Sequence, residues 1–346
     1  MDYYFGVDVG GTNIKLGMFS ESGRMLENWE IPTRGRNYTE VGKNDIMQNI
    51  AGEILYILEE RCISRTKVRG VGIGVPGPVL DNGYVESCVN LGLTDINPSL
   101  VLSELLGGIP VTVGNDANVA ALGEMWRGGG IGYQSLVLVT LGTGVGSGVI
   151  LDGKIVYGAK GLGGEIGHIM VNPNETDICN CGGRGCLDQM ASATGIVRNA
   201  GKILKDTSLP SVLRGMEGFT ARDVVDAAKA GDPAALVTLD YCMQFLGKCL
   251  AAVSYVVDPQ VFVIGGGVSA AGDFLIRIIQ EHYEKHAILK KEKAKIVLAV
   301  MGNDAGYYGA ARMAMDKKEE RHAFLARTDG IYCDTAAIHG SGSGTN

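Results

Sequence analysis

Three cysteines and one histidine lie close enough together in the sequence to bind a metal ion. Cys179, Cys181 and Cys186 fall in the run C-x-C-G-G-R-G-C, and ten residues separate His168 from the first of them. Three thiolates and one imidazole form a common tetrahedral set for structural zinc, and the glycines allow a tight turn around the ion. The sequence therefore predicts a structural Zn²⁺ site held by these four side chains.

Two glycine turns with similar surroundings occur in the chain. Each separates two apolar runs that alternate like strands. Glycine lets backbone N–H groups approach an anion closely, so such a turn can hold phosphate oxygens. One turn alone is also what an ordinary hairpin requires, but its repetition predicts two phosphate loops. They are Gly10, Gly11 and Thr12, and Gly142, Thr143 and Gly144.

Three side chains could complete the first loop. Asp8 offers a carboxylate for a hydrated Mg²⁺, Thr12 a hydroxyl, and Lys15 a positive charge beside the phosphates. No GxxxxGK[ST] run occurs, which excludes the nucleotide loop of P-loop enzymes.

A third glycine run, Gly265-Gly266-Gly267, stands between an apolar strand and a helix pattern. With Ala270 it fits the short G-x-G-x-x-A pattern of dinucleotide sites. Nothing nearby supplies hydride chemistry, however, so we interpret the run as a loop that faces a nucleotide.

Asn115 and Asp116 end a strand where a helix is about to begin. A hydroxyl that attacks a phosphoryl group needs a carboxylate to accept its proton, and an Asp on a rigid strand end suits that role. Asn and Asp are also frequent helix N-caps, and spacing alone favours the cap. Glu165 and Asp188 flank the cysteine cluster and could accept hydrogen bonds from sugar hydroxyls, or could simply be solvated loop charges.

The elements around these residues repeat. Strand, glycine turn, strand, two-residue turn and strand occur from Tyr3 to Ile31 and again from Ser135 to Tyr157, which indicates two similar α/β lobes. Further predicted strands are 68–75, 111–113, 260–264 and 295–300. The predicted helices are 45–60, 98–106, 118–126, 221–229, 233–257, 273–286 and 305–318.

Composition excludes several classes of protein. The 346 residues are 46% hydrophobic and carry a net charge of −7, which argues against a nucleic-acid or membrane-surface partner. The N-terminus has no signal-peptide pattern, and no window is apolar for about 18 residues. We therefore expect a cytoplasmic protein.

In these motifs, taken in order and spacing, the sequence resembles the ROK family of repressors and sugar kinases, and within it the bacterial glucokinases. The resemblance runs from Asp8 to about Ala314. It rests on D-x-G-G-T, the pair Asn115-Asp116, G-T-G, E-x-x-H and C-x-C-G-x-x-G-C. It implies an actin-like (ribonuclease H-like) α/β ATPase fold, with two lobes around a central cleft where ATP and the sugar meet.

The resemblance also implies roles for individual residues. Asp116 would be the general base, and Gly265–Gly267 would lie against the adenosine. The sugar would contact Asn90, Asn115, Asp116, Glu165, His168 and Asp188, with His168 fixed by zinc. ROK proteins are commonly dimers, so we expect a homodimer.

The resemblance implies a division of the chain as well. A small lobe (1–117) would carry the first phosphate loop and Asp116, and a large lobe (118–303) the second loop, the zinc site and the adenosine loop. A helix (304–318) would return to the small lobe. Residues 319–346 are unassigned, with a tail from 339 at the latest.

Two departures from the family pattern leave the hexose open. Asp188 stands where the family usually has Glu, and Leu93 where glucokinases often have Trp. Glucose is the expected substrate, and the alternatives are N-acetylmannosamine, fructose or allose. A repressor would need an N-terminal helix-turn-helix, for which there is no room before Asp8. A non-catalytic sugar-binding protein is disfavoured by the two phosphate loops and Asp116.

Overall fold

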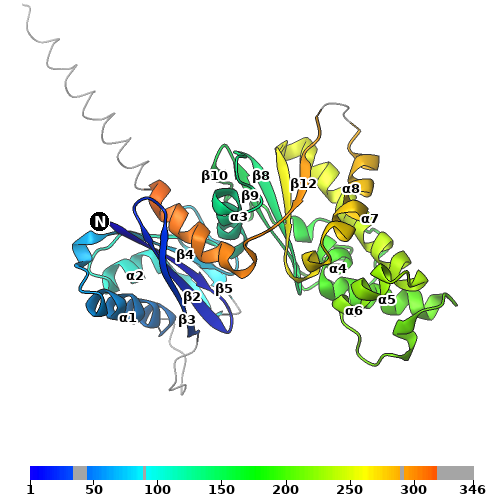
Figure 1. Cartoon of the computed structure of the whole chain (residues 1–346), viewed down its shortest axis with the longest axis horizontal. Helices are drawn as coiled ribbons and strands as arrows, with labels where there is room; N and C mark the ends of the chain where they lie inside the picture. The colour runs from blue at the N-terminus through cyan, green and yellow to red at the C-terminus, as the bar shows by residue number, and fades with distance from the viewer. Residues whose placement is uncertain (34–44, 89–90, 289–291, 318–346) are drawn as a thin grey trace, which may run out of the picture.

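The computed structural model describes residues 1–33, 45–88, 91–288 and 292–317 (Figure 1). Two five-stranded sheets share one plan, in which three antiparallel strands are followed by two parallel ones. The first has the order β3-β2-β1-β4-β7 and the second β10-β9-β8-β11-β12. The predicted duplication is therefore correct, and it extends from three strands to all five.

The strands of the first sheet are β1 (Tyr3–Val9), β2 (Asn13–Ser20), β3 (Met25–Pro32), β4 (Val68–Val75) and β7 (Val111–Asn115). Those of the second are β8 (Leu136–Leu141), β9 (Val145–Leu151), β10 (Lys154–Ile155), β11 (Val261–Gly265) and β12 (Lys295–Leu298). A separate hairpin, β5 (Val85–Cys88) and β6 (Leu93–Ile96), was not predicted.

The helices are α1 (Asp45–Glu60), α2 (Pro98–Leu105), α3 (Asp116–Arg127), α4 (Leu187–Ala191), α5 (Ala193–Asp206), α6 (Ala221–Lys229), α7 (Pro233–Val257) and α8 (Asp273–His286). Residues 305–317 form a C-terminal helix. The predicted bounds of α1, α6, α7 and α8 are correct. The predicted start of α3 at Asn118 was wrong by two residues, because Asn115 caps the helix there. The α4 and α5 helices were not predicted.

Each sheet has its own apolar core. One core joins the first sheet to α1 and α2, and the other joins the second sheet to helices α4 to α8. Figure 1 shows the resulting pair of α/β units, with α3 and the orange C-terminal helix near their junction. Burial of these apolar faces is the main force that holds each unit together.

The C-terminal helix lies directly on the first sheet because glycines in the strands leave room for it. A Cβ on Gly6 or Gly72 would overlap the carbonyl of Tyr307 or Ala310. The same helix crosses α3 closely, since a Cβ on Gly309 would overlap the carbonyl of Val119. The α3 helix contacts strands of both sheets. The predicted boundary at residue 117 falls inside α3, and the division into lobes stays a prediction.

Among the residues that the structure describes, α7 is the one helix whose length and composition would let it cross a membrane. In its most apolar window, 61% of the residues are buried inside the structure. Its contacts with α5, α6 and α8 are those of a core helix.

One buried carboxylate was not predicted from the sequence. Glu124, on α3, is 1% exposed and accepts hydrogen bonds from the backbone N–H groups of Gly129 (2.7 Å), Met301 (2.9 Å) and Val300 (3.3 Å). It therefore ties the end of α3 to the segment that leads into the C-terminal helix.

We expect Glu124→Ala to lower the free energy of unfolding by roughly 2–4 kcal/mol, because it leaves backbone donors without an acceptor. Glu124→Gln keeps one of the two acceptor oxygens, so it should cost less than Glu124→Ala. Urea unfolding at neutral pH measures both. An alanine variant within about 0.5 kcal/mol of the wild type would contradict this role.

Candidate active site

The first glycine loop joins β1 to β2 and is held at its base. The N–H of Gly10 donates to the carbonyl of Asn13 (3.0 Å), as the hairpin turn requires. Thr33 binds the loop from the end of β3: its hydroxyl donates to the Gly10 carbonyl (2.6 Å) and its N–H to the Thr12 carbonyl (2.9 Å). Gly11 and Thr12 are exposed at the tip, where a ligand can reach them.

Asp8, at the end of β1, lies beside other charged groups. Burial raises the pKa of its carboxyl to about 6, the Asp116 carboxylate adds to that rise, and the Lys15 ammonium opposes it. Gly306 packs against the carboxyl of Asp8 so closely that a Cβ there would overlap it. Lys15 also donates a hydrogen bond from Nζ to the carbonyl of Asn303 (3.2 Å). The start of the C-terminal helix therefore closes one side of the first loop.

Asn115 and Asp116 play different parts at the start of α3. Asn115 is the N-cap: its Oδ1 accepts from the N–H groups of Ala117 (3.0 Å) and Asn118 (3.1 Å), and its Nδ2 donates to the Gly77 carbonyl (3.0 Å). The capping alternative is therefore correct for Asn115. Asp116 is the first residue of the helix, where the helix dipole favours a negative charge.

The surroundings of Asp116 raise its pKa. Burial is the largest cause, and the Glu165 carboxylate raises the pKa further, while a hydrogen bond from the Ala117 N–H (2.8 Å) lowers it. The first turn of α3 packs against β9, because Gly148 leaves room for the backbone of Ala117 and Asn118. Asp116 therefore stands at the carboxyl edge of the first sheet and beside the second.

The second glycine loop joins β8 to β9. Gly142 donates from its N–H to the carbonyl of Gly144 (2.9 Å), two residues on, whereas Gly10 in the first loop bonds to the carbonyl three residues on. The N–H of Val145, just after the loop, donates to Oδ1 of Asp188 (2.7 Å). The sequence predicted a sugar contact for Asp188. The structure shows that Oδ1 of Asp188 binds the backbone beside the second glycine loop, and the sugar contact stays a prediction.

The run Gly265–Gly267 lies against this second loop. Gly266 has φ +82°, and a Cβ on it would stand 2.5 Å from the backbone nitrogen of Leu141. The run leads into a short 3-10 turn, Gly267–Ala271, and α8 begins only at Asp273. A dinucleotide site has its helix directly after the glycines, so the geometry disfavours that alternative.

Glu165 and His168 occupy one short turn. Ser147 on β9 fixes it by donating from Oγ to the Gly164 carbonyl and accepting from the Ile166 N–H (3.2 Å). Both Glu165 and His168 are exposed. The turn therefore presents a carboxylate and an imidazole to the solvent side, near Asp116.

The four predicted metal ligands converge. Their ligand atoms lie within 4.8 Å of one another, with 3.9 Å from Cys179 Sγ to His168 Nδ1 and 3.6 Å from Cys181 Sγ to Cys186 Sγ. Sulfur ligands about 2.3 Å from a tetrahedral Zn²⁺ stand roughly 3.8 Å apart. Burial raises the pKa of the Cys186 thiol to about 12, and the thiols of Cys181 and Cys179 add to the rise. The raised pKa favours the protonated thiol in the absence of a metal. A bound divalent cation favours the thiolate instead, so the residues fit zinc.

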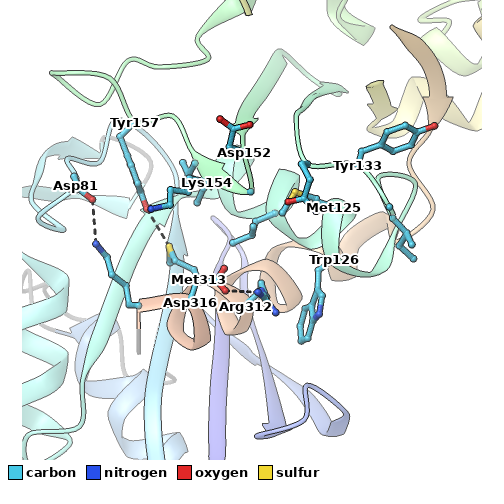
Figure 2. Close-up of a pocket in the computed structure, with 17 residues that line it drawn as sticks. Asp81, Met125, Trp126, Tyr133, Asp152, Lys154, Tyr157, Arg312, Met313 and Asp316 are labelled. Atoms are coloured by element: carbon cyan, nitrogen blue, oxygen red, sulfur yellow. Dashed lines mark hydrogen bonds and ion pairs between the residues drawn. The ribbon is translucent and has the colours of Figure 1, made fainter. Parts of the chain in front are cut away.

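A cavity of about 840 Å³ lies elsewhere (Figure 2). Its walls come from α3, the C-terminal helix and the β9–β10 turn, with Trp126, Arg312 and Lys154 among them. None of the predicted site residues lines it, so it is a separate feature of the surface.

Asn90 lies outside the described residues, so its predicted place is untested. The sequence did not predict the contacts of Ser147, of Gly306 or of Thr194, whose hydroxyl donates to the Thr143 carbonyl in the second loop (2.6 Å). Thr194 carries a weak signal, because it follows the N-cap Ser192 at the start of a helix. The contacts of Ser147 and Gly306 join segments far apart in the chain, and no local pattern marks them.

Known proteins resemble this chain over nearly its whole length. Residues 4–317 match the ROK family. A glucokinase of Halalkalibacterium halodurans is 41% identical over 312 residues, which cover 89% of this chain and 93% of that protein.

Solved structures give the same result for the fold. A ROK hexokinase from Thermus thermophilus has a TM-score of 0.77 and 29% identity, covering 92% of this chain and 99% of that one. A ROK family glucokinase from Streptomyces griseus, in complex with glucose and AMPPNP, has a TM-score of 0.67 and 30% identity over 91% and 99%. The predicted actin-like ATPase fold is confirmed.

The raised pKa of Asp8 makes stability depend on pH. The folded chain keeps a proton on Asp8 up to about pH 6, whereas the ordinary value is 3.8. The stability that this group contributes therefore falls as pH rises between those values. Asp8→Asn has no such charge, so its free energy of unfolding relative to wild type should increase from pH 4.5 to 6.5 and then level off.

Urea unfolding of both proteins without nucleotide measures this difference. A gap between Asp8→Asn and wild type that stays constant across the range would contradict the assignment.

Proposed function

This chain belongs to the ROK family, and on that premise we propose that it transfers the γ-phosphoryl group of ATP to a hexose, with glucose as the substrate. The observation that carries the proposal is the position of Asp116. Its carboxylate lies at the first turn of α3, at the carboxyl edge of the first sheet, within electrostatic reach of Asp8 and Glu165.

Asp116 is the general base of the proposed reaction. It accepts the proton of the sugar hydroxyl as that oxygen attacks the γ-phosphorus and ADP leaves. Burial and Glu165 raise the pKa of Asp116, which makes the carboxylate a stronger base than an exposed Asp. The hydrogen bond from the Ala117 N–H fixes its orientation.

The two glycine loops hold the phosphates from either side. Gly11 and Thr12 are exposed, so the phosphates can reach the tip of the first loop. Lys15 places a cation beside this loop. Mg²⁺ neutralises phosphate charge when bound, and Asp8 is the carboxylate that would face it or its water ligands. Gly265–Gly267 lie against the second loop, which suits the adenosine side of the nucleotide.

Glu165 and His168 receive the sugar hydroxyls from one rigid turn. Zn²⁺ on His168, Cys179, Cys181 and Cys186 would fix the imidazole through Nδ1, the nitrogen that faces Cys179, and leave the other nitrogen for the sugar. The Nδ2 group of Asn115 already binds Gly77, so Asn115 has one amide proton left for a ligand.

Another hexose, such as N-acetylmannosamine, fructose or allose, is the alternative substrate, because a few contacts to the sugar's substituents decide between them. A non-catalytic sugar sensor is the less favoured alternative. The homodimer, the lack of a nucleic-acid partner and the cytoplasmic location stay predictions.

Replacing the base tests the mechanism. We expect Asp116→Asn to lower kcat by about 10²–10⁴-fold while the KM for ATP changes little, because the amide cannot accept the proton. A coupled assay of ADP release measures both. Turnover close to that of wild type would overturn the role of Asp116.

Zinc content tests the metal site without reference to activity. We expect one zinc ion per chain by elemental analysis, and loss of that ion in Cys181→Ser. Cys62→Ser is the matched control, because Cys62 is exposed like Cys181 and belongs to no metal cluster among the described residues. A Cys181→Ser protein that keeps its zinc would contradict the assignment.

A further inference from the structure

The short segment from Cys186 to Thr194 reaches the second glycine loop at three points. It contains α4 and the start of α5. Asp188 accepts from the Val145 N–H (2.7 Å), the Ala193 N–H donates to the Gly142 carbonyl (2.8 Å), and the Thr194 hydroxyl donates to the Thr143 carbonyl (2.6 Å). The proposed function assigns the loop to phosphate binding, but it gives no role to these three hydrogen bonds.

The bonds decide which way the loop's N–H groups point. In a trans peptide the C=O and the following N–H point in opposite directions. The carbonyls of Gly142 and Thr143 are both held toward α5, so the N–H groups of Thr143 and Gly144 must point away from it. Consecutive N–H groups turned to one side are what an anion-binding loop needs.

Asp188 fixes the end of the same loop. Its Oδ1 takes the Val145 N–H, and a Cβ on Gly144 would stand 2.6 Å from that oxygen. A larger residue at position 144 would therefore push the carboxylate away from the loop. A side chain one methylene longer would not place its carboxylate at the same point without moving the loop or itself.

We propose that Asp188 is a positioning residue for the second phosphate loop and acts through it on nucleotide affinity. Thr194, at the other end of the segment, holds the same loop through its bond to the Thr143 carbonyl. The proposal rests on the proposed function, because the loop is taken to hold the phosphates of ATP.

The first experiment separates the nucleotide from the sugar. We expect Asp188→Ala to raise the KM for ATP about tenfold and to leave the KM for glucose within about twofold. Asp188→Asn keeps an oxygen that accepts from Val145, so it should restore the KM for ATP to within about threefold of wild type. A rise confined to the KM for glucose would overturn the proposal and make Asp188 a sugar ligand.

The second experiment measures binding directly and does not depend on how the Asp188 variants fold. Titration calorimetry with Mg·ADP, without sugar, should show about fivefold weaker binding for Thr194→Val. Thr207→Val is the matched control, because its hydroxyl also donates to a carbonyl (Ile203, 2.7 Å) but lies at the opposite end of α5. Equal affinities for the two variants would count against the proposal.

These outcomes are distinct from failure of the proposed function. If the wild type neither binds Mg·ADP nor phosphorylates any hexose, the proposed function is wrong. If it does both while Asp188→Ala and Thr194→Val bind the nucleotide normally, only the positioning role is wrong.

Discussion

The close crossing of α3 and the C-terminal helix is the contact on which the rest of the site depends. Gly123 and Gly309 carry no Cβ, so the two backbones touch where any larger residue would collide with Ala305 or Val119. One helix begins with Asp116 and the other packs Gly306 against Asp8. The crossing therefore holds the carboxylates of Asp8 and Asp116 together at the edge of the first sheet, beside strands of the second.

The carboxylates of Asp8, Asp116 and Glu165 therefore concentrate negative charge in a partly buried site. Asp116 raises the pKa of Asp8, and Glu165 raises that of Asp116. Such a cluster destabilises the charged protein by itself, and a cation relieves the repulsion. A site that is unfavourable alone and favourable with Mg²⁺ and a polar substrate is what phosphoryl transfer to a sugar requires.

Much of this could be predicted from the sequence. Glycine turns between alternating apolar runs are local signals, so the duplication, both loops and the cysteine cluster were visible. The β5–β6 hairpin was not, because its strands are only four residues long. The bond between Asp188 and Val145 could not be predicted, because it joins residues distant in the chain. Nothing in the sequence distinguishes Glu124 from an exposed helix charge, and only the fold shows that it is buried.

Phosphorylation of a hexose by ATP, and of glucose in particular, is tested by ADP release with Mg·ATP against glucose, mannose, fructose, N-acetylglucosamine and N-acetylmannosamine in turn. We expect the highest kcat/KM for glucose. A preference for another hexose would keep the mechanism and change the substrate. No sugar-dependent ADP release, from a folded protein that holds its zinc, would contradict the claim.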